Sequence, residues 1–121
     1  MNTILIVEDS ASNIRLAQAI LSNAGYKVVV AANAETALPL LNTYQPGVVL
    51  MDINLPGMDG LTALQHLRTD PQTRATKVIA ITAMAMKGDR ERILAAGFDD
   101  YVAKPFTVEQ LLAAVQAAFA S

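Results

Sequence analysis

Three acidic residues and one lysine stand at the ends of short apolar segments in this sequence. Glu8 and Asp9 follow one apolar run, Asp52 ends another, and Lys104, which precedes Pro105, closes a third. If these segments are parallel strands of one sheet, the charged groups converge at one edge. Carboxylates about 5 Å apart would repel one another by about 3 kcal/mol per pair at an effective dielectric constant of roughly 20. Such a group is suited to hold a divalent cation and to accept a phosphoryl group.

The expected metal ion is Mg²⁺, with Mn²⁺ as a substitute. Glu8, Asp9 and Asp52 would provide carboxylate oxygens, and Asn54 could provide its backbone carbonyl. Three ionised carboxylates and one ammonium leave a net charge of −2, which a divalent cation cancels. The chain has no cysteine, and its one histidine, His66, falls on a predicted helix, where a solvated position is expected. Ligand sets made only of oxygen are those that hard cations prefer.

Asp52 is the candidate nucleophile, because an aspartate can attack phosphorus to give an acyl phosphate. Lys104 would pair with an oxygen of the transferred group as a mobile point charge. Thr82, at the end of another apolar run, can donate a hydrogen bond from its hydroxyl to a second oxygen. Each residue alone is a weak signal, since an acidic residue after a strand is usually only a loop residue. The prediction therefore rests on the joint pattern.

Short apolar runs alternate with helical patterns along the chain, and these elements carry the charged residues. Strands are predicted at residues 3–7, 27–31, 48–51, 78–81 and 100–103, and helices at 12–24, 34–44, 61–68, 89–96 and from 107 onward. The apolar runs are nearly continuous, which is typical of parallel strands that are covered on both faces. Five strands that are each followed by a helix predict a doubly wound α/β fold with a five-stranded parallel sheet.

The strand ends also predict the strand order. Sites in doubly wound sheets lie outside the carboxyl ends of the strands, where the strand order reverses. Four of the five predicted strands end in a residue that the proposed chemistry uses, whereas the second ends in the unreactive sequence Ala-Ala-Asn at residues 31–33. The second strand is therefore expected at an edge, away from the site. The flavodoxin-like order 2-1-3-4-5 places it there.

The composition is that of one small domain. The chain has 121 residues, of which 53% are hydrophobic, and its formal net charge is −2 with no basic run. This is enough apolar material for one core, and the charge pattern argues against direct binding of nucleic acid. No apolar run approaches the roughly 18–20 residues that span a membrane. We expect a cytoplasmic protein with one domain over residues 1–121 and no output domain.

The same residues carry a resemblance to a known family. Residues 4–9, 49–60 (VLMDINLPGMDG), 79–83 (IAITA) and 100–105 (DYVAKP) resemble the receiver domain of two-component response regulators, and the match covers the whole chain. Residues 82–89 are similar to the cell-division regulator DivK and to the receivers of hybrid kinases. The motif set is specific, so the resemblance predicts a signalling protein.

The resemblance implies a phosphoacceptor switch in a two-component or phosphorelay pathway. Asp52 would be phosphorylated by a histidine kinase or a histidine phosphotransfer protein in a Mg²⁺-dependent reaction. Thr82 and Lys104 would sense the phosphoryl group, Tyr101 would be the switch aromatic, and the peptide bond before Pro105 would be cis. Such a protein is a switch rather than an enzyme, although it assists its own phosphorylation and dephosphorylation.

The output would pass through protein–protein contacts. The last predicted helix is rich in alanine, so the face formed by the fourth helix, the fifth strand and the fifth helix could bind a downstream target or a second copy of the chain. High helix propensity explains the alanines equally well. The chain could act as a free-standing regulator, as a monomer or weak dimer, or as the receiver of a larger hybrid kinase.

Three other functions compete with this interpretation. A Mg²⁺-dependent aspartyl phosphatase of the haloacid dehalogenase type also uses an aspartate at a strand end, but it needs a second aspartate two residues later, where this chain has Asn54. A flavin-binding protein needs a loop that cradles a phosphate after the first strand, where Glu8 and Asp9 would repel it. A scaffold with an inactive site is hard to reconcile with a complete set of site residues.

Overall fold

The computed structural model describes residues 2–53, 57, 60–83 and 88–120. The strands are β1 (Thr3–Val7), β2 (Lys27–Ala31), β3 (Val48–Asp52), β4 (Lys77–Thr82) and β5 (Asp100–Ala103), and the helices are α1 (Ala11–Asn23), α2 (Ala34–Tyr44), α3 (Gly60–Thr69), α4 (Asp89–Ala95) and α5 (Val108–Ala120). All strand pairs are parallel, in the order β2-β1-β3-β4-β5. The predicted doubly wound fold and strand order are confirmed. Within the described ranges, every helix is too short or too polar to cross a bilayer.

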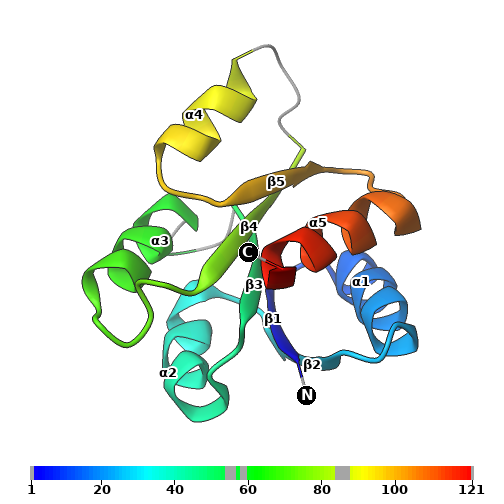
Figure 1. Cartoon of the computed structure of the whole chain (residues 1–121), viewed down its shortest axis with the longest axis horizontal. Helices are drawn as coiled ribbons and strands as arrows, with labels where there is room; N and C mark the ends of the chain where they lie inside the picture. Colours follow the sequence, from blue (N-terminus) through cyan, green and yellow to red (C-terminus); the bar gives the residue numbers. More distant parts are fainter. Residues whose placement is uncertain (1, 54–56, 58–59, 84–87, 121) are drawn as a thin grey trace.

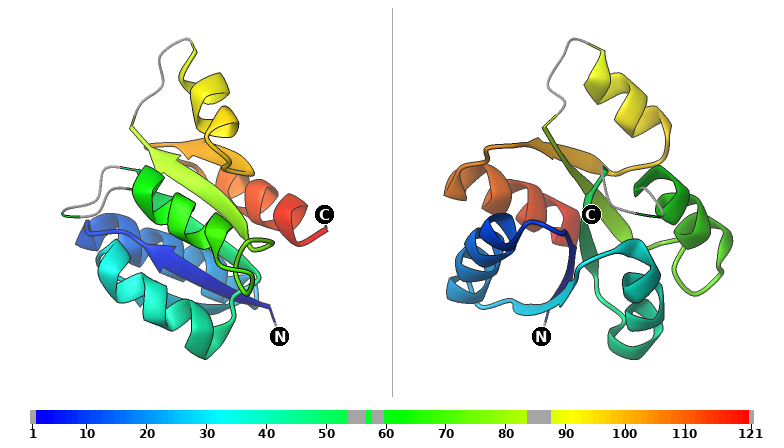
Figure 2. Two further views of the ribbon diagram at one scale, coloured as in Figure 1. Left: turned by 90° about the vertical axis from the view of Figure 1, so that its left-hand side faces the viewer. Right: turned by 180° about the vertical axis from the view of Figure 1, so that it is seen from behind.

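The sheet lies between two layers of helices, with α1 and α5 on one face and α2, α3 and α4 on the other (Figures 1 and 2). Alternate residues of β3 enter the two cores: Val49 and Met51 pack under the α2–α4 layer, while Val48 and Leu50 pack under α1 and α5. The whole of β3 is buried, which explains its continuous apolar run. The strand therefore delivers Asp52 to the site from the middle of the sheet.

Local signals set the helix ends. Asn33 caps α2, since its Oδ1 accepts a hydrogen bond from the backbone N–H of Thr36 at 2.8 Å. Thr107 and Gln110 form a reciprocal capping box at α5, in which each side chain accepts from the other residue's backbone N–H, at 3.0 and 3.1 Å. Gly25 follows α1 with a φ of +96°, a conformation that glycine adopts without strain. These contacts place the helices, and hence the loops at the strand ends.

The chain packs tightly where it returns to β3 at the start of α3. Gly60 donates a backbone hydrogen bond to the carbonyl of Ile53 at 3.0 Å. A Cβ atom at Gly60 would lie 2.8 Å from the Asp52 carbonyl oxygen and 2.8 Å from the Ile53 Cα. Both obstacles are backbone atoms, so they cannot rotate away. Glycine is therefore required at this position for close packing.

We expect Gly60→Ala to lower the free energy of unfolding by about 1–3 kcal/mol, because it overpacks the backbone. Gly47→Ala is a matched control, because the three atoms nearest to its Cβ atom all belong to the side chain of Phe119 rather than to the backbone. Urea unfolding followed by circular dichroism measures both losses. A loss at Gly60 no larger than that at Gly47 would contradict this account of the packing.

Candidate functional site

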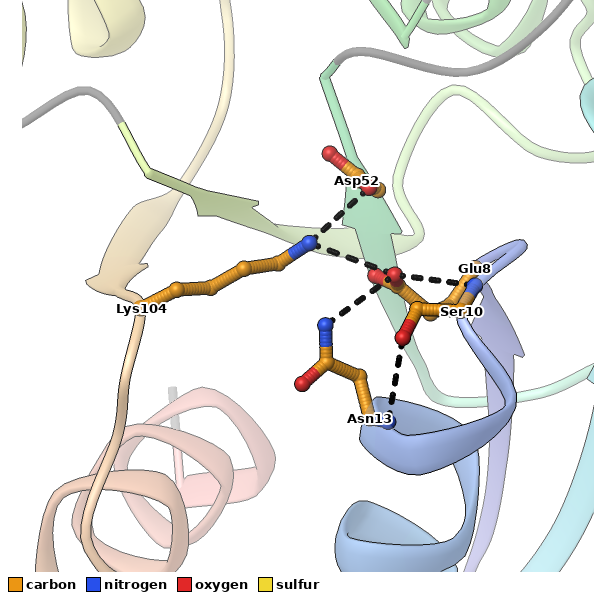
Figure 3. A network of polar contacts seen from close by, with 5 residues as sticks. All are labelled: Glu8, Ser10, Asn13, Asp52 and Lys104. Atoms are coloured by element: carbon orange, nitrogen blue, oxygen red, sulfur yellow. Dashed lines mark hydrogen bonds and ion pairs between the residues drawn. The ribbon is translucent and has the colours of Figure 1, made fainter.

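The carboxyl ends of the strands bring the predicted charged residues together (Figure 3). Glu8 directly follows β1, Asp52 ends β3, and Lys104 directly follows β5. The Lys104 ammonium donates to Asp52 Oδ2 at 3.0 Å and to Glu8 Oε1 at 3.2 Å. Glu8, Asp9 and Asp52 each offer a carboxylate oxygen, and these atoms lie within 4.8 Å of one another. The predicted convergence of these four side chains is present in the structure.

The three carboxylates differ in their exposure to solvent. Glu8 is 1% exposed and Asp52 is 5% exposed, whereas Asp9 is exposed. The Lys104 side chain reaches over the two buried carboxylates and is 19% exposed. Asp9 is therefore open to solvent, whereas the carboxylates of Glu8 and Asp52 are enclosed.

Thr82 and Tyr101 lie on the two strands beyond β3. Asp52 pairs with Ile81, the residue before Thr82, and the backbone N–H of Lys104 donates to the Thr82 carbonyl at 2.8 Å. Thr82 is fully buried. Tyr101 is half-buried and packs against the core under the α2–α4 layer. The backbone thus places Thr82 between the strands that carry Asp52 and Lys104.

Burial sets the electrostatics of this group. Desolvation raises the pKa of Glu8 above its ordinary value of 4.5, and the charge of Asp52 raises it further, while Lys104 and Asn13 partly oppose the shift. Burial lowers the pKa of Lys104, but its hydrogen bond to Asp52 and the charges of Glu8 and Asp52 outweigh this, so the pKa rises above 10.5. Lys104 therefore stays protonated between the two carboxylates at neutral pH.

The raised pKa of Glu8 predicts how stability depends on pH in metal-free buffer. The folded protein holds the proton on Glu8 more tightly than the unfolded chain, so the Glu8 contribution falls as pH rises from 4.5 through the folded-state pKa. We expect wild type to lose free energy of unfolding relative to Glu8→Gln in that window, because the amide does not titrate. Urea unfolding with EDTA, from pH 4.5 to neutrality, measures the difference. A stability of wild type relative to Glu8→Gln that stays constant or rises with pH would contradict the expectation.

The carboxylate group fits a hard divalent cation. Oε2 of Glu8 is buried and has no hydrogen-bond partner among the described residues. Leaving a buried polar atom unsatisfied costs about 1–3 kcal/mol. This oxygen lies in the same cluster as the oxygens of Asp9 and Asp52, and Mg²⁺ prefers such ligands. The acidic group could therefore hold a metal ion, as predicted.

Sequence reasoning missed two residues that contact Glu8. The backbone N–H of Ser10 donates to Glu8 Oε1 at 3.3 Å, and Asn13 Nδ2 donates to the same oxygen at 3.4 Å. Ser10 also caps α1, because its Oγ accepts from the backbone N–H of Asn13 at 3.4 Å. Their three-residue spacing is that of an N-terminal capping motif. The Ser10–Asn13 spacing could have indicated this cap. However, a helix predicted to start at residue 12 puts the N-cap at residue 11, one position after Ser10.

Three other sequence predictions have separate outcomes. The peptide bond between Lys104 and Pro105 is cis, as expected. His66 is exposed on α3, which agrees with a solvated position. Asn54 lies outside the described residues, so its carbonyl stays a predicted ligand.

Comparisons with known proteins agree with the sequence motifs. The family model of the response regulator receiver domain matches residues 4–116. The polar-differentiation response regulator DivK of Brucella anthropi is 37% identical over 114 residues, which are 94% of this chain and 93% of that protein. The matches therefore extend over nearly the whole chain.

Solved structures show the same architecture. The receiver domain of the sensor histidine kinase PA1611 from Pseudomonas aeruginosa is 37% identical, with a TM-score of 0.90 over 99% of this chain and 98% of that chain. In that structure a magnesium ion is coordinated in the active site cleft. Chemotaxis protein CheY4 of Vibrio cholerae is 29% identical, with a TM-score of 0.90 over 98% of each chain. The strand order and helix layers are thus those of known signalling domains.

Proposed function

Because the chain belongs to the response regulator receiver domain family, we propose that it is a signalling switch whose phosphoacceptor is Asp52. The observation that supports this residue most strongly is its environment at the end of β3. Its Oδ2 lies 3.0 Å from Lys104 Nζ, and its carboxylate belongs to a cluster of three that could hold a metal ion. A carboxylate in such a setting is equipped for nucleophilic attack on phosphorus.

In the proposed reaction, Asp52 attacks the phosphorus of a phosphohistidine on a histidine kinase or a histidine phosphotransfer protein. An oxygen–phosphorus bond forms on Asp52 as the phosphorus–nitrogen bond breaks, and the leaving imidazole nitrogen takes up a proton. Lys104, which now bridges Glu8 and Asp52, turns to an oxygen of the incoming group as a mobile positive charge. Thr82 donates its hydroxyl to another oxygen of that group.

Mg²⁺, or Mn²⁺ as a substitute, is the proposed cofactor of this reaction. Glu8, Asp9 and Asp52 would hold it, together with the backbone carbonyl of Asn54. When bound, the ion would neutralise negative charge on the transferred group. The buried and unpartnered Oε2 of Glu8 supports this assignment, and the magnesium ion in the similar PA1611 receiver supports the choice of ion.

We propose that phosphorylation reaches partners through Thr82 and Tyr101, at the face formed by α4, β5 and α5. The Tyr101 ring lies on this face, with the Arg90 guanidinium of α4 5.7 Å from its centre. Both residues line a shallow pocket together with Ala114 of α5. A movement of Tyr101 would therefore change the surface that a target protein meets. A cytoplasmic location and a monomer or weak dimer stay sequence-based predictions.

Labelling of the wild-type protein tests the proposed function. With radiolabelled acetyl phosphate, a small phosphoryl donor, the protein should take up label in the presence of Mg²⁺ and not in EDTA. Hydroxylamine, which cleaves acyl phosphates, should release the label and leave a hydroxamate that mass spectrometry maps to Asp52. Label on a different residue, or none with Mg²⁺ present, would overturn the proposal. Steady turnover of phosphoesters would favour the aspartyl phosphatase instead.

A further inference from the structure

The two oxygens of the Glu8 carboxylate have different surroundings (Figure 3). Oε1 accepts three hydrogen bonds, from the backbone N–H of Ser10 at 3.3 Å, from Asn13 Nδ2 at 3.4 Å and from Lys104 Nζ at 3.2 Å. Oε2 is buried and has no partner among the described residues. Among the described residues, the donors to this carboxylate therefore all bind Oε1, and Oε2 is left for a ligand.

One of the three donors has a second role. Lys104 also binds Asp52 at 3.0 Å, and a phosphoryl group on Asp52 would attract its charge away from Glu8. The backbone N–H of Ser10 and the Asn13 amide would then be the remaining donors on Oε1. The Asn13 side chain is neutral, whereas that of Lys104 is positively charged. Asn13 can therefore hold the Glu8 carboxylate without neutralising the negative charge that attracts a cation.

The backbone of Asn13 is itself anchored. Asn13 lies in the first turn of α1, and its N–H donates to Oγ of the N-cap residue Ser10 at 3.4 Å. The side chain therefore reaches Glu8 from a capped helix turn rather than from a free loop. Supports of this kind, one contact away from a metal ligand, fix the direction in which the ligand atom points.

We propose that Asn13 is a positioning residue of the cation site: its amide holds Glu8 Oε1 so that Oε2 stays directed at the metal ion. This inference rests on the proposed function, because it takes Glu8, Asp9 and Asp52 as the residues that bind Mg²⁺. The chemistry also explains the residue type. An aspartate at position 13 could not donate to Oε1 and would add a negative charge next to Glu8, whereas a lysine would compete with the cation.

Mg²⁺ titration of the unphosphorylated protein tests this role by isothermal calorimetry. We expect Asn13→Ala to weaken Mg²⁺ binding by about 10-fold, which is the usual scale for losing a support of a metal ligand. Ser12→Ala, an exposed neighbour in the same turn, is the local control and should bind Mg²⁺ as wild type does.

A second readout separates positioning from a general loss of stability. Asn33→Ala removes the side-chain cap of α2, which is not part of the cation site, so it should lower Tm equally in EDTA and in Mg²⁺. Asn13→Ala should instead shrink the rise in Tm that Mg²⁺ produces. In labelling with acetyl phosphate, it should raise the Mg²⁺ concentration needed for the half-maximal rate by about 10-fold and leave the plateau near that of wild type.

Wild-type Mg²⁺ affinity in Asn13→Ala would overturn the role of Asn13, and so would an equal loss of affinity in Asn33→Ala. The failure of the proposed function looks different. If the wild-type protein itself binds no Mg²⁺ or takes no label on Asp52, the function and this inference fall together. If wild type binds Mg²⁺ and is labelled on Asp52 while Asn13→Ala binds equally well, only the inference about Asn13 fails.

Discussion

Asp52→Asn is expected to abolish phosphoryl labelling while leaving the fold intact. An amide oxygen is a far poorer nucleophile than a carboxylate, and it cannot form the stable acyl phosphate that the proposed reaction requires. The fold should survive because the asparagine Oδ1 can still accept a hydrogen bond from Lys104, now 3.0 Å from Asp52 Oδ2. The substitution also removes one of three clustered negative charges. Labelling with acetyl phosphate and circular dichroism measure the two expectations together.

Asp9→Asn is the matched comparison, because Asp9 belongs to the same cluster but is not the proposed nucleophile. Its loss should weaken Mg²⁺ binding and slow labelling, and high Mg²⁺ should restore part of the rate. Asp52→Asn should stay unlabelled at every Mg²⁺ concentration. Label in Asp52→Asn equal to that of wild type would show that another residue accepts the phosphoryl group.

Arg68→Ala is expected to lower the free energy of unfolding although Arg68 lies outside the site. Arg68 extends from α3 and donates to the carbonyls of Arg74 and Thr76 at 3.0 and 2.6 Å. These two bonds come from Nη1, whereas Nη2 donates to the Gly97 carbonyl at 3.0 Å and to Asp99 Oδ2 at 2.9 Å. One side chain thus ties α3 to the segment before β4 and to the segment before β5.

The expected loss of unfolding free energy in Arg68→Ala is about 2–3 kcal/mol. Hydrogen bonds that involve a charged group contribute about 1.5–3 kcal/mol each when buried, but the ion pair with Asp99 is 25% and 33% exposed on its two sides, so solvent weakens its share. Asp99 Oδ2 keeps its bond from the Val78 backbone N–H at 2.8 Å. Urea unfolding measures the loss.

Arg68→Lys and Arg15→Ala make the prediction about Arg68 specific. A lysine presents one ammonium and cannot reach both pairs of acceptors, so Arg68→Lys should recover less than half of the lost stability. Arg15 is exposed on α1, and Arg15→Ala should change stability by less than about 0.5 kcal/mol. If Arg68→Lys is as stable as wild type, the four hydrogen bonds of the Arg68 guanidinium are not what stabilises the contact between α3 and the segments before β4 and β5. Labelling of Arg68→Ala below its Tm should be unaffected, because Arg68 is not among the proposed site residues.

The architecture could be predicted from short-range patterns. Near-continuous apolar runs marked the strands because a parallel strand covered on both faces buries every side chain. Asn33, Thr107 and Gly25 marked helix ends because their side chains or backbone conformations act within a few residues. The unreactive end of the second strand predicted that β2 lies at an edge, and the sheet has it there.

The individual side-chain contacts could not be predicted in the same way. Lys104 and Glu8 are 96 positions apart, and Arg68 and Asp99 are 31 apart. Whether such side chains meet depends on how far each reaches from its own strand or helix and on which rotamer the packing leaves open. Asn13 gives an example at short range. In a capping box its side chain would accept a hydrogen bond from the backbone N–H of the N-cap residue, whereas here its amide donates to Glu8.

The fold, the strand order and the types of group at the sheet edge thus follow from local patterns in the chain, because periodicity and chain direction place the end of every parallel strand on the same side. Which atoms of those groups are bound depends on how the elements pack in three dimensions. This packing places three donors on Glu8 Oε1 and, among the described residues, none on Oε2. This asymmetry arises because burial limits which donors can reach each oxygen, and that constraint exists only once β1, β3, β5 and α1 have packed together.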